Sequence, residues 1–525
     1  MEQNRNSRIV FRVSLLLTSI FILLGIFFNE SLSAISSTFL KTTIDQFGWF
    51  YLIAAMLFLC FSVYLCFSRF GNIRLGDDTD RPSFGTGSWL AMLFGAGMGI
   101  GIVFWGVAEP VYHYVSPPYG TGSTAESASL SMQYTFFHWG LHPWAIYTVI
   151  GLSLAFFQFK KKLPALVSSA FYPLLGNRIH GPIGKTIDIL AVFATVFGIA
   201  TSLGLGAMQV AGGMNSLFAT PNSTTVQILV IAVAAVLYMI SISTGLERGI
   251  KYLSNTTMIL SFLIMAVMLV LGPTTQIFKT LIHTMGSYIN NLPSMSLRLE
   301  PFKKDEWLAN WTLFYWAWWI AWAPFVGMFI ARISKGRTIK EFVFGVLLAP
   351  TLGTFVWLSV FGGSVLHFIH NLGNAALAKQ VTADVSLALF KLFELFPFTS
   401  LLNVLGFIII VTYYITVADT STFVLGMLSE QGNLNPSNKI KITWGTIQAF
   451  VAIVLLLSGG LEALQTASVT AAFPFAIVMV IMCWALLKGL KNEMAANHGH
   501  TAESESENEI GNSVTEVTEQ KIYTL

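Results

Sequence analysis

The chain has 525 residues, of which 54% are hydrophobic and only 10% are charged, and its formal net charge is +3. Together with a mean hydropathy of +0.67, this composition excludes a soluble globular protein. Apolar runs of roughly 20 residues recur, each long enough to cross the hydrocarbon core of a bilayer. Cys60, Cys66 and Cys483 all lie within such runs, so no disulfide framework is implied. We therefore predict an all-α polytopic membrane protein, surrounded by lipid bilayer and with no nucleic-acid partner.

The hydropathy pattern predicts twelve membrane-spanning helices along the chain. The first is interpreted as a retained helix, because it is long and no small-residue cleavage site follows it. The predicted spans are 10–28, 48–68, 88–108, 136–158, 187–211, 225–243, 256–274, 311–331, 342–366, 402–427, 443–460 and 467–489.

Lysine and arginine are distributed unequally between the loops. The segments 110–133, 212–224 and 461–466 contain neither residue, whereas the alternate loops are basic. The loop at 275–310 is an exception, but long loops follow the positive-inside rule poorly. The pattern predicts that both termini are cytoplasmic in a protein of the plasma membrane.

The spans fall into two blocks of five, at 88–274 and 311–490. Because five is an odd number, consecutive blocks have opposite topology, which is the inverted-repeat plan of many secondary transporters. The segment 1–87 then carries two extra helices, and 275–310 is a loop in which we expect an interfacial helix. The tail at 491–525 is polar and acidic, and we predict that it is cytoplasmic and disordered.

The first helix of the first block is unusually rich in glycine. Gly95, Gly97, Gly99 and Gly101 alternate with small or apolar residues around Met98. Glycines at this density destabilise a helix and expose its backbone; the alternative explanation is close helix packing through small residues. An interruption in the first helix of a repeat points to the substrate site of a transporter.

The first helix of the second block carries a dense group of aromatic residues. Tyr315, Trp318, Trp319 and Trp322 have helical spacing and share one face. Pro324 follows and removes a backbone donor, which predicts a break there. Aromatic belts at the membrane surface are the common alternative, but these residues lie deep in the span. An indole N–H at that depth needs a partner that lipid does not supply.

A third aromatic group opens the span at 136–158, with Trp139, Trp144 and Tyr147 on neighbouring positions. Together with the tryptophans of 311–331, these rings predict a cage that attracts a quaternary ammonium ion through cation–π contacts. The predicted walls contain no Asp or Glu, which favours a zwitterion over a bare cation. Its negative group would meet N–H groups at the glycine-rich break.

The other polar residues of the spans give weaker signals. His138 and His142 have the i, i+4 spacing of a metal pair, but no third ligand is apparent. Glu109 at the end of a span is either an interfacial cap or a functional acid. Asp419 is an acid within a span, where such groups are usually functional or paired. Since no catalytic dyad or metal triad is found, we expect neither an enzyme nor a bound cofactor.

Two stretches, GAGMGIGIVFWGVAEP at 95–110 and FYWAWWIAWAPFVGMFIARISKGRTIKEF at 314–342, resemble the betaine/carnitine/choline transporter family. The resemblance implies a LeuT-like five-plus-five inverted repeat preceded by two extra helices, alternating access, and a homotrimer. Glycine betaine is the expected substrate, with choline or carnitine as the alternative. The resemblance assigns the substrate box and its pathway to Trp139, Trp144, Tyr147, Trp318, Trp319, Trp322 and Phe325, beside Gly97, Met98, Gly99 and Gly101.

The resemblance also bears on the coupling ion. Sodium-coupled members use paired hydroxyls on two helices beside backbone carbonyls of the glycine-rich helix, which correspond here to Thr195, Thr416, Gly95 and Met98. In this chain Ile199 and Val417 occupy positions where further hydroxyls are expected, and sodium requires oxygen ligands. Sodium coupling is therefore doubtful, and proton coupling through Asp419 or His142, or exchange, is the alternative. The acidic tail also departs from the basic tail of osmosensing members.

Overall fold

A computed structural model describes residues 9–97, 99–244, 247–302 and 305–522. These residues are almost entirely helical and contain no strand, only an isolated bridge between Arg74 and Thr338, so the all-α prediction is confirmed. The principal helices are α2 (Ile9–Phe27), α3 (Asn29–Phe67), α4 (Thr86–Gly97), α5 (Ile100–Val115), α6 (Ala125–Trp139), α7 (Leu141–Ala155), α9 (Pro182–Phe218), α10 (Thr224–Thr244), α11 (Glu247–Leu271), α12 (Thr274–Ser296), α14 (Phe314–Ile333), α15 (Ile339–Leu366), α18 (Thr399–Ser429) and α19 (Asn438–Ile522).

Short helices complete the connections. They are α8 (Tyr172–Leu175), α13 (Glu306–Leu308), α16 (Ala375–Ala383) and α17 (Ala388–Phe393), with brief turns at 69–72, 156–160, 167–171, 176–180, 309–313, 367–371 and 385–387. The loop predicted at 275–310 contains α12, which packs against α6 and α15.

Ten helices in the described ranges are long and apolar enough to cross a membrane, or eleven when the bent pair α4–α5 is taken as one span. The predicted number is twelve. The last two predicted spans both fall in α19, which contains the non-helical residues Gly459 (φ 158°) and Gly460 (φ 59°). Dividing α19 at this kink accounts for the difference between eleven and twelve.

The interruption predicted in the glycine-rich helix is present, because α4 and α5 meet at an angle of 62°. The break predicted at Pro324 is wrong: α14 runs without interruption from Phe314 to Ile333, with Pro324 inside it. Proline removes only one backbone hydrogen bond, and neighbouring helices stabilise such a helix in a membrane protein. Here α7, α9 and α19 pack against α14 and support it on several sides.

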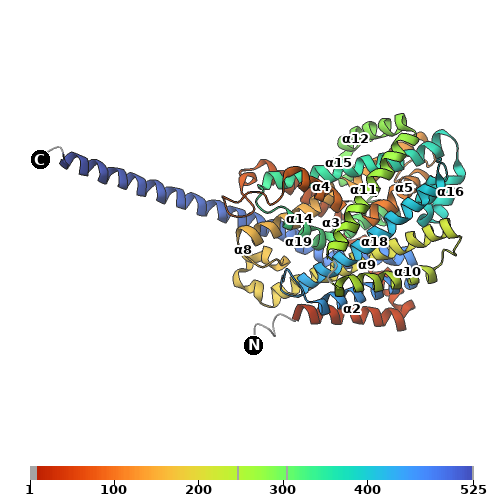
Figure 1. Ribbon diagram of the computed structural model, residues 1–525, viewed down its shortest axis with the longest axis horizontal. Helices are drawn as coiled ribbons and strands as arrows, with labels where there is room; N and C mark the ends of the chain where they lie inside the picture. Colours follow the sequence, from red (N-terminus) through yellow and green to blue (C-terminus); the bar gives the residue numbers. More distant parts are fainter. Residues whose placement is uncertain (1–8, 98, 245–246, 303–304, 523–525) are drawn as a thin grey trace.

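The buried and peripheral helices differ sharply. We compare the share of buried residues in the most apolar 18-residue stretch of each span. This share is 94% in α6–α7 and 83% in the span that contains α14, but only 28% in α2, 28% in α10 and 22% in α11. The central helices therefore form the core, and the peripheral ones present apolar side chains to lipid. Figure 1 shows α2 and α10 along one border of the bundle.

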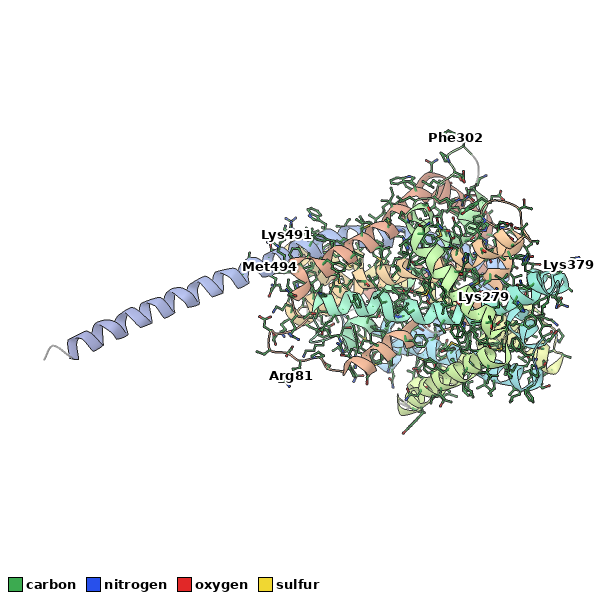
Figure 2. The ribbon with its side chains drawn as sticks, turned by 90° about the horizontal axis from the view of Figure 1, so that it is seen from above. Arg81, Lys279, Phe302, Lys379, Lys491 and Met494 are labelled. Atoms are coloured by element: carbon green, nitrogen blue, oxygen red, sulfur yellow. The ribbon has the colours of Figure 1, made fainter. Side chains whose placement is uncertain are left out.

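The two chain ends share one end of the bundle. In Figure 1, α2 begins at the end from which α19 leaves, and Figure 2 places Arg81 at that end with Lys491 and Met494, while Lys379 lies at the opposite end. The tail, for which composition predicts disorder, is drawn as a continuation of α19 to Ile522 that projects away from the bundle (Figure 1). Its sequence contains no Pro after Pro474 that would interrupt the helix.

Candidate functional site

A cavity lies between the bend of α4–α5, the start of α7, and the middle of α14. Eight residues that the sequence predicted for the site line it: Gly99, Gly101, Trp139, Trp144, Tyr147, Trp318, Trp319 and Trp322. The remaining lining residues were not predicted to contact substrate: Ala96, Ile100, Ile102, Pro143, Ser202, Val326, Thr354 and Val417. Six parts of the chain thus supply the lining: the α4–α5 bend, the α6–α7 junction, α9, α14, α15 and α18.

The aromatic rings of the cavity contact one another mostly edge to face. Trp319 lies 5.0 Å from Trp139 and 6.3 Å from Tyr147 between ring centroids, and Tyr147 lies 5.5 Å from Trp144. Interplanar angles of 73–79° in these pairs leave ring faces turned toward different sides of the cavity. Trp318 instead stacks on Trp319 at 4.9 Å. Such perpendicular rings present several π-faces to one occupant, as a cation-binding cage requires.

Backbone carbonyls accept hydrogen bonds from two of the four indoles of α14. Trp319 Nε1 donates to the carbonyl oxygen of His138 over 3.0 Å, and Trp322 Nε1 donates to that of Gly198 over 2.8 Å. The His138 carbonyl is available because the chain leaves helical geometry at Gly140, between α6 and α7. These bonds supply the partners that buried indole N–H groups need. The Trp318 indole nitrogen has no partner within the described part of the chain.

Gly101 allows two tryptophans to approach the backbone of α5. A β-carbon at this position would lie 2.7 Å from Cη2 of Trp318 and 3.2 Å from Cη2 of Trp139. Both atoms belong to buried rings that cannot move freely. The glycine is therefore needed for the shape of the cavity rather than for an unusual backbone angle.

The start of α5 faces the same cavity. Gly99 is its N-cap residue and has no side chain to accept from the first turn, and Ile100, Gly101 and Ile102 follow it along the cavity wall. The first N–H groups of a helix have no partner within the helix. Together with the helix dipole, they favour a negatively charged group at this point.

Glu109 is a site residue whose role the sequence did not determine. Its side chain is fully buried, and Oε2 accepts from Trp139 Nε1 over 2.8 Å and from the Tyr315 hydroxyl. Oε1 lies 2.7 Å from His138 Nδ1 and 3.2 Å from His113 Nε2. The carboxyl group is thus not an interfacial cap but lies directly behind one wall of the cavity. The sequence offered two signals for it, its place at the end of a predicted span and its place within the stretch 95–110.

The two histidines with the spacing of a metal pair, for which no third ligand was expected, do not face a common point. His142 Nε2 contacts Ser296 Oγ at 3.0 Å, while His138 Nε2 contacts Thr312 Oγ1 at 2.9 Å, so the two rings serve different partners. The break at Gly140 separates them. Ligand atoms of Glu109, His113 and His138 do lie within 4.8 Å of one another, but these atoms are already hydrogen bonded to one another, and we assign no metal there.

Among the described residues, the predicted ion-coupling residues Gly95, Thr195, Thr416 and Asp419 are not part of the cavity lining. The hydroxyls of Thr195 and Thr416 donate to carbonyls one turn earlier in their own helices, at 2.7 Å and 2.8 Å. Ile199 is fully buried, whereas Val417 faces the cavity. Gly95 lies against Met258 of α11.

Four further predicted residues complete the comparison. Phe325 does not line the cavity but packs edge to face on Trp322 at 5.2 Å. Gly97 ends α4, and Met98 lies outside the described residues. Asp419 is buried within α18, where its carbonyl accepts from Thr422 Oγ1.

Comparison with known proteins gives the family. A family model described as BCCT, betaine/carnitine/choline family transporter, matches residues 9–495. The glycine betaine transporter OpuD of Bacillus subtilis (strain 168) is 48% identical over 487 residues, covering 92% of this chain and 94% of the relative. A probable glycine betaine transporter of Desulfitobacterium hafniense (strain Y51) is 43% identical over 496 residues, or 94% and 99% of the two chains.

A relative with a different named substrate lies at similar distance. The ectoine/hydroxyectoine transporter of Virgibacillus pantothenticus is 41% identical over 485 residues, covering 92% of this chain and 96% of the relative. The substrate of this chain therefore has to be argued from the chemistry of its cavity. The family itself is established by the match: this chain belongs to the betaine/carnitine/choline transporter family, whose members are membrane transporters and not enzymes.

Proposed function

We propose that the chain is a secondary transporter that takes up glycine betaine by alternating access around the aromatic cavity. The observation that carries this proposal is the set of perpendicular rings, Trp139, Trp144, Tyr147 and Trp319, around one space. A trimethylammonium group has no N–H donor, so aromatic faces suit it better than hydrogen-bond acceptors. A desolvated cation–π contact is worth about 2 kcal/mol.

The second charge of glycine betaine also has a partner. Its carboxylate would lie at the first turn of α5, where Gly99 and Gly101 carry no side chain that covers the backbone. By the family resemblance, Gly97 and Met98 would belong to the same site. The Trp318 indole nitrogen, which has no partner among the described residues, offers another donor beside this turn. Trp322 and Phe325 would line the path by which the substrate leaves.

Choline and carnitine are the alternative substrates within this class. Choline has no carboxylate, so the N–H groups at the start of α5 would meet only its hydroxyl, a weaker acceptor. Two relatives named as glycine betaine transporters, one known and one probable, share 48% and 43% identity with this chain, which supports betaine.

For coupling, we propose that a cation gradient drives uptake and that sodium is not required. The hydroxyls expected beside Thr195 and Thr416 are replaced by Ile199 and Val417, which leaves only two hydroxyl oxygens at these positions. A site assembled from so few oxygen ligands suits sodium poorly. The proposed driving force is therefore a proton gradient, with Asp419 among the candidate groups, and exchange is the alternative mechanism.

We further propose that the protein works as a homotrimer in the cell membrane, with both termini in the cytoplasm. The distribution of basic loops supports this orientation. The two five-helix blocks at 88–274 and 311–490, preceded by 1–87, would then be related as an inverted repeat.

The test is uptake of labelled glycine betaine into proteoliposomes that contain the full chain. One arm has an inward sodium gradient, a second has equal potassium, a third has an inward proton gradient, and a parallel set uses choline. Sodium-independent accumulation of betaine is the expected result. Accumulation only with sodium would overturn the coupling proposal, and failure to bind or transport either compound would overturn the substrate proposal.

A further inference from the structure

The carboxyl group of Glu109 divides its two oxygens between two kinds of partner. Oε2 accepts from Trp139, which lines the cavity, and from Tyr315, whose ring lies 5.9 Å from that of Trp319. Oε1 faces only His138 and His113. Oε2 therefore contacts the aromatic residues at the cavity, and Oε1 contacts only the two histidines.

The partners of Oε2 and Oε1 differ in whether they can take up a proton. The Trp139 indole can only donate, so Oε2 must remain an acceptor while that bond is present. Either histidine can donate or accept, depending on its tautomer. His138 Nε2 contacts the Thr312 hydroxyl at 2.9 Å, which can also donate or accept, and His113 Nδ1 has no partner among the described residues. One additional proton can therefore bind among Oε1, His113 and His138 while both hydrogen bonds at Oε2 remain.

From this arrangement we propose that ionised Glu109 is the counter-charge of the aromatic cavity, and that a proton held by Glu109, His113 and His138 controls its strength. The carboxylate lies at the nitrogen edge of the Trp139 indole, a ring that lines the cavity, while Glu109 itself is not among the lining residues. Charges act strongly on one another where water is excluded. The ionised group thus attracts a cation in the cavity, and protonation removes this attraction without displacing the ring.

The proposal predicts how protonation changes ligand affinity and which ligand is affected more. A proton and a cationic ligand oppose one another, so each lowers the affinity for the other by the same factor. Choline carries a net positive charge and gains the full attraction. Glycine betaine carries both charges, so its carboxylate offsets much of the effect. The choline-to-betaine affinity ratio should therefore fall as the pH falls.

The immediate partners of Glu109 are His113, His138, Trp139 and Tyr315, and none of them is a lysine, an arginine or a second carboxyl group. Other titratable residues lie on elements that pack against α5. They are Glu126 and Tyr134 on α6, Lys185 and Asp188 on α9, Lys340 and Glu341 on α15, Lys379 on α16, Lys391 on α17, Asp384 before Val385, and Tyr413, Tyr414 and Asp419 on α18.

A purely structural role makes a different prediction. If Glu109 only orients Trp139 and Tyr315, replacing it weakens choline and betaine equally and leaves the pH dependence of their affinity ratio unchanged. The charge role instead separates the two ligands. This inference rests on the proposed binding of ammonium compounds in the cavity. The experiment is designed so that failure of the inference can be distinguished from failure of that proposed function.

The experiment is equilibrium binding of choline and of glycine betaine to the purified full chain between pH 5.5 and 8.5, followed by tryptophan fluorescence. Neither ligand titrates in this range. For the wild type we expect the choline affinity to fall about tenfold toward low pH, within the range of typical coupling between two sites, and the betaine affinity to change much less. Glu109→Gln should bind choline weakly at every pH, with the ratio flat. Glu126→Gln, an exposed acid at the start of α6, is the matched control and should behave as the wild type.

The wild-type ratio alone tests the inference if Glu109→Gln does not fold. A choline-to-betaine ratio that is flat with pH in the wild type would overturn it, as would equal weakening of both ligands in a folded Glu109→Gln variant. In either case the ammonium-binding cavity itself would stand. Absence of binding of both ligands to folded wild-type protein would overturn the proposed function, and this inference with it.

Discussion

The indole nitrogen of Trp319 lies 3.0 Å from the carbonyl oxygen of His138, to which it donates a hydrogen bond. This bond joins the middle of α14 to the point where α6 ends, just before Gly140. It satisfies a donor that would otherwise be stranded in an apolar environment. It also holds the ring perpendicular to Trp139, so the break between α6 and α7 contributes directly to the shape of the cavity.

Replacing Trp319 with alanine should raise the apparent transport constant for glycine betaine at least tenfold, since a desolvated cation–π contact of about 2 kcal/mol is lost. Trp319→Phe keeps a ring but loses the bond to His138, so a smaller effect is expected. Uptake kinetics in proteoliposomes measure both. Trp484→Ala is the control, because that indole is 63% exposed on α19. Equal kinetics for Trp319→Ala and the wild type would exclude this ring from the cage.

Replacing Gly101 with alanine should abolish ligand binding and lower thermal stability. The added β-carbon would approach Trp318 to 2.7 Å, and overpacking of this kind costs about 1–3 kcal/mol. Gly87→Ala, near the start of α4, is the matched control because nothing lies within 4 Å of its added carbon. Unchanged binding by Gly101→Ala would mean that the tryptophans adjust without loss of the site.

Restoring hydroxyl groups should create sodium dependence. The double variant Ile199→Thr and Val417→Ser adds two oxygen ligands near Thr195 and Thr416, and hard cations bind oxygen. We expect sodium to stimulate betaine uptake by this variant but not by the wild type. A control with Ile199→Val and Val417→Ala keeps both positions apolar. If the wild type already requires sodium, the two apolar residues do not prevent its binding.

Arg337 should matter for stability rather than for transport. Its guanidinium lies 3.9 Å from the centre of the Trp89 ring and donates to the Phe84 carbonyl, which ties the loop before α15 to the start of α4. A desolvated cation–π contact contributes about 2 kcal/mol, so Arg337→Ala should unfold at a clearly lower temperature. Arg332→Ala, an exposed neighbour, is the control. Identical melting of both variants would show that this contact contributes little.

Much of the cavity could be predicted from the sequence, because it depends on spacing within single helices. Trp318, Trp319 and Trp322 share a face wherever a helix forms, and the density of glycine around Gly99 indicates an interruption whatever surrounds it. These features are local. Eight of the lining residues were accordingly predicted before the arrangement of the helices was known.

The errors concern features that depend on packing between helices. Pro324 weakens an isolated helix, but α14 packs against several neighbouring helices and continues through this residue. Glu109 stands just beyond a predicted span, where it suits an interface. Its burial arises only because α6 and α14 bring His138 and Tyr315 to it. Ser202 and Thr354 reach the cavity for the same reason.

The most direct test of the central claim compares glycine betaine with 3,3-dimethylbutanoate, which has the same shape and carboxylate but a carbon in place of the ammonium nitrogen. Each compound competes against labelled glycine betaine in proteoliposomes. If aromatic faces recognise the positive charge, the carbon analogue competes at least about tenfold more weakly, which corresponds to about 1.4 kcal/mol. Equal competition by the two compounds would contradict the account, because it would show that shape and the carboxylate alone determine recognition.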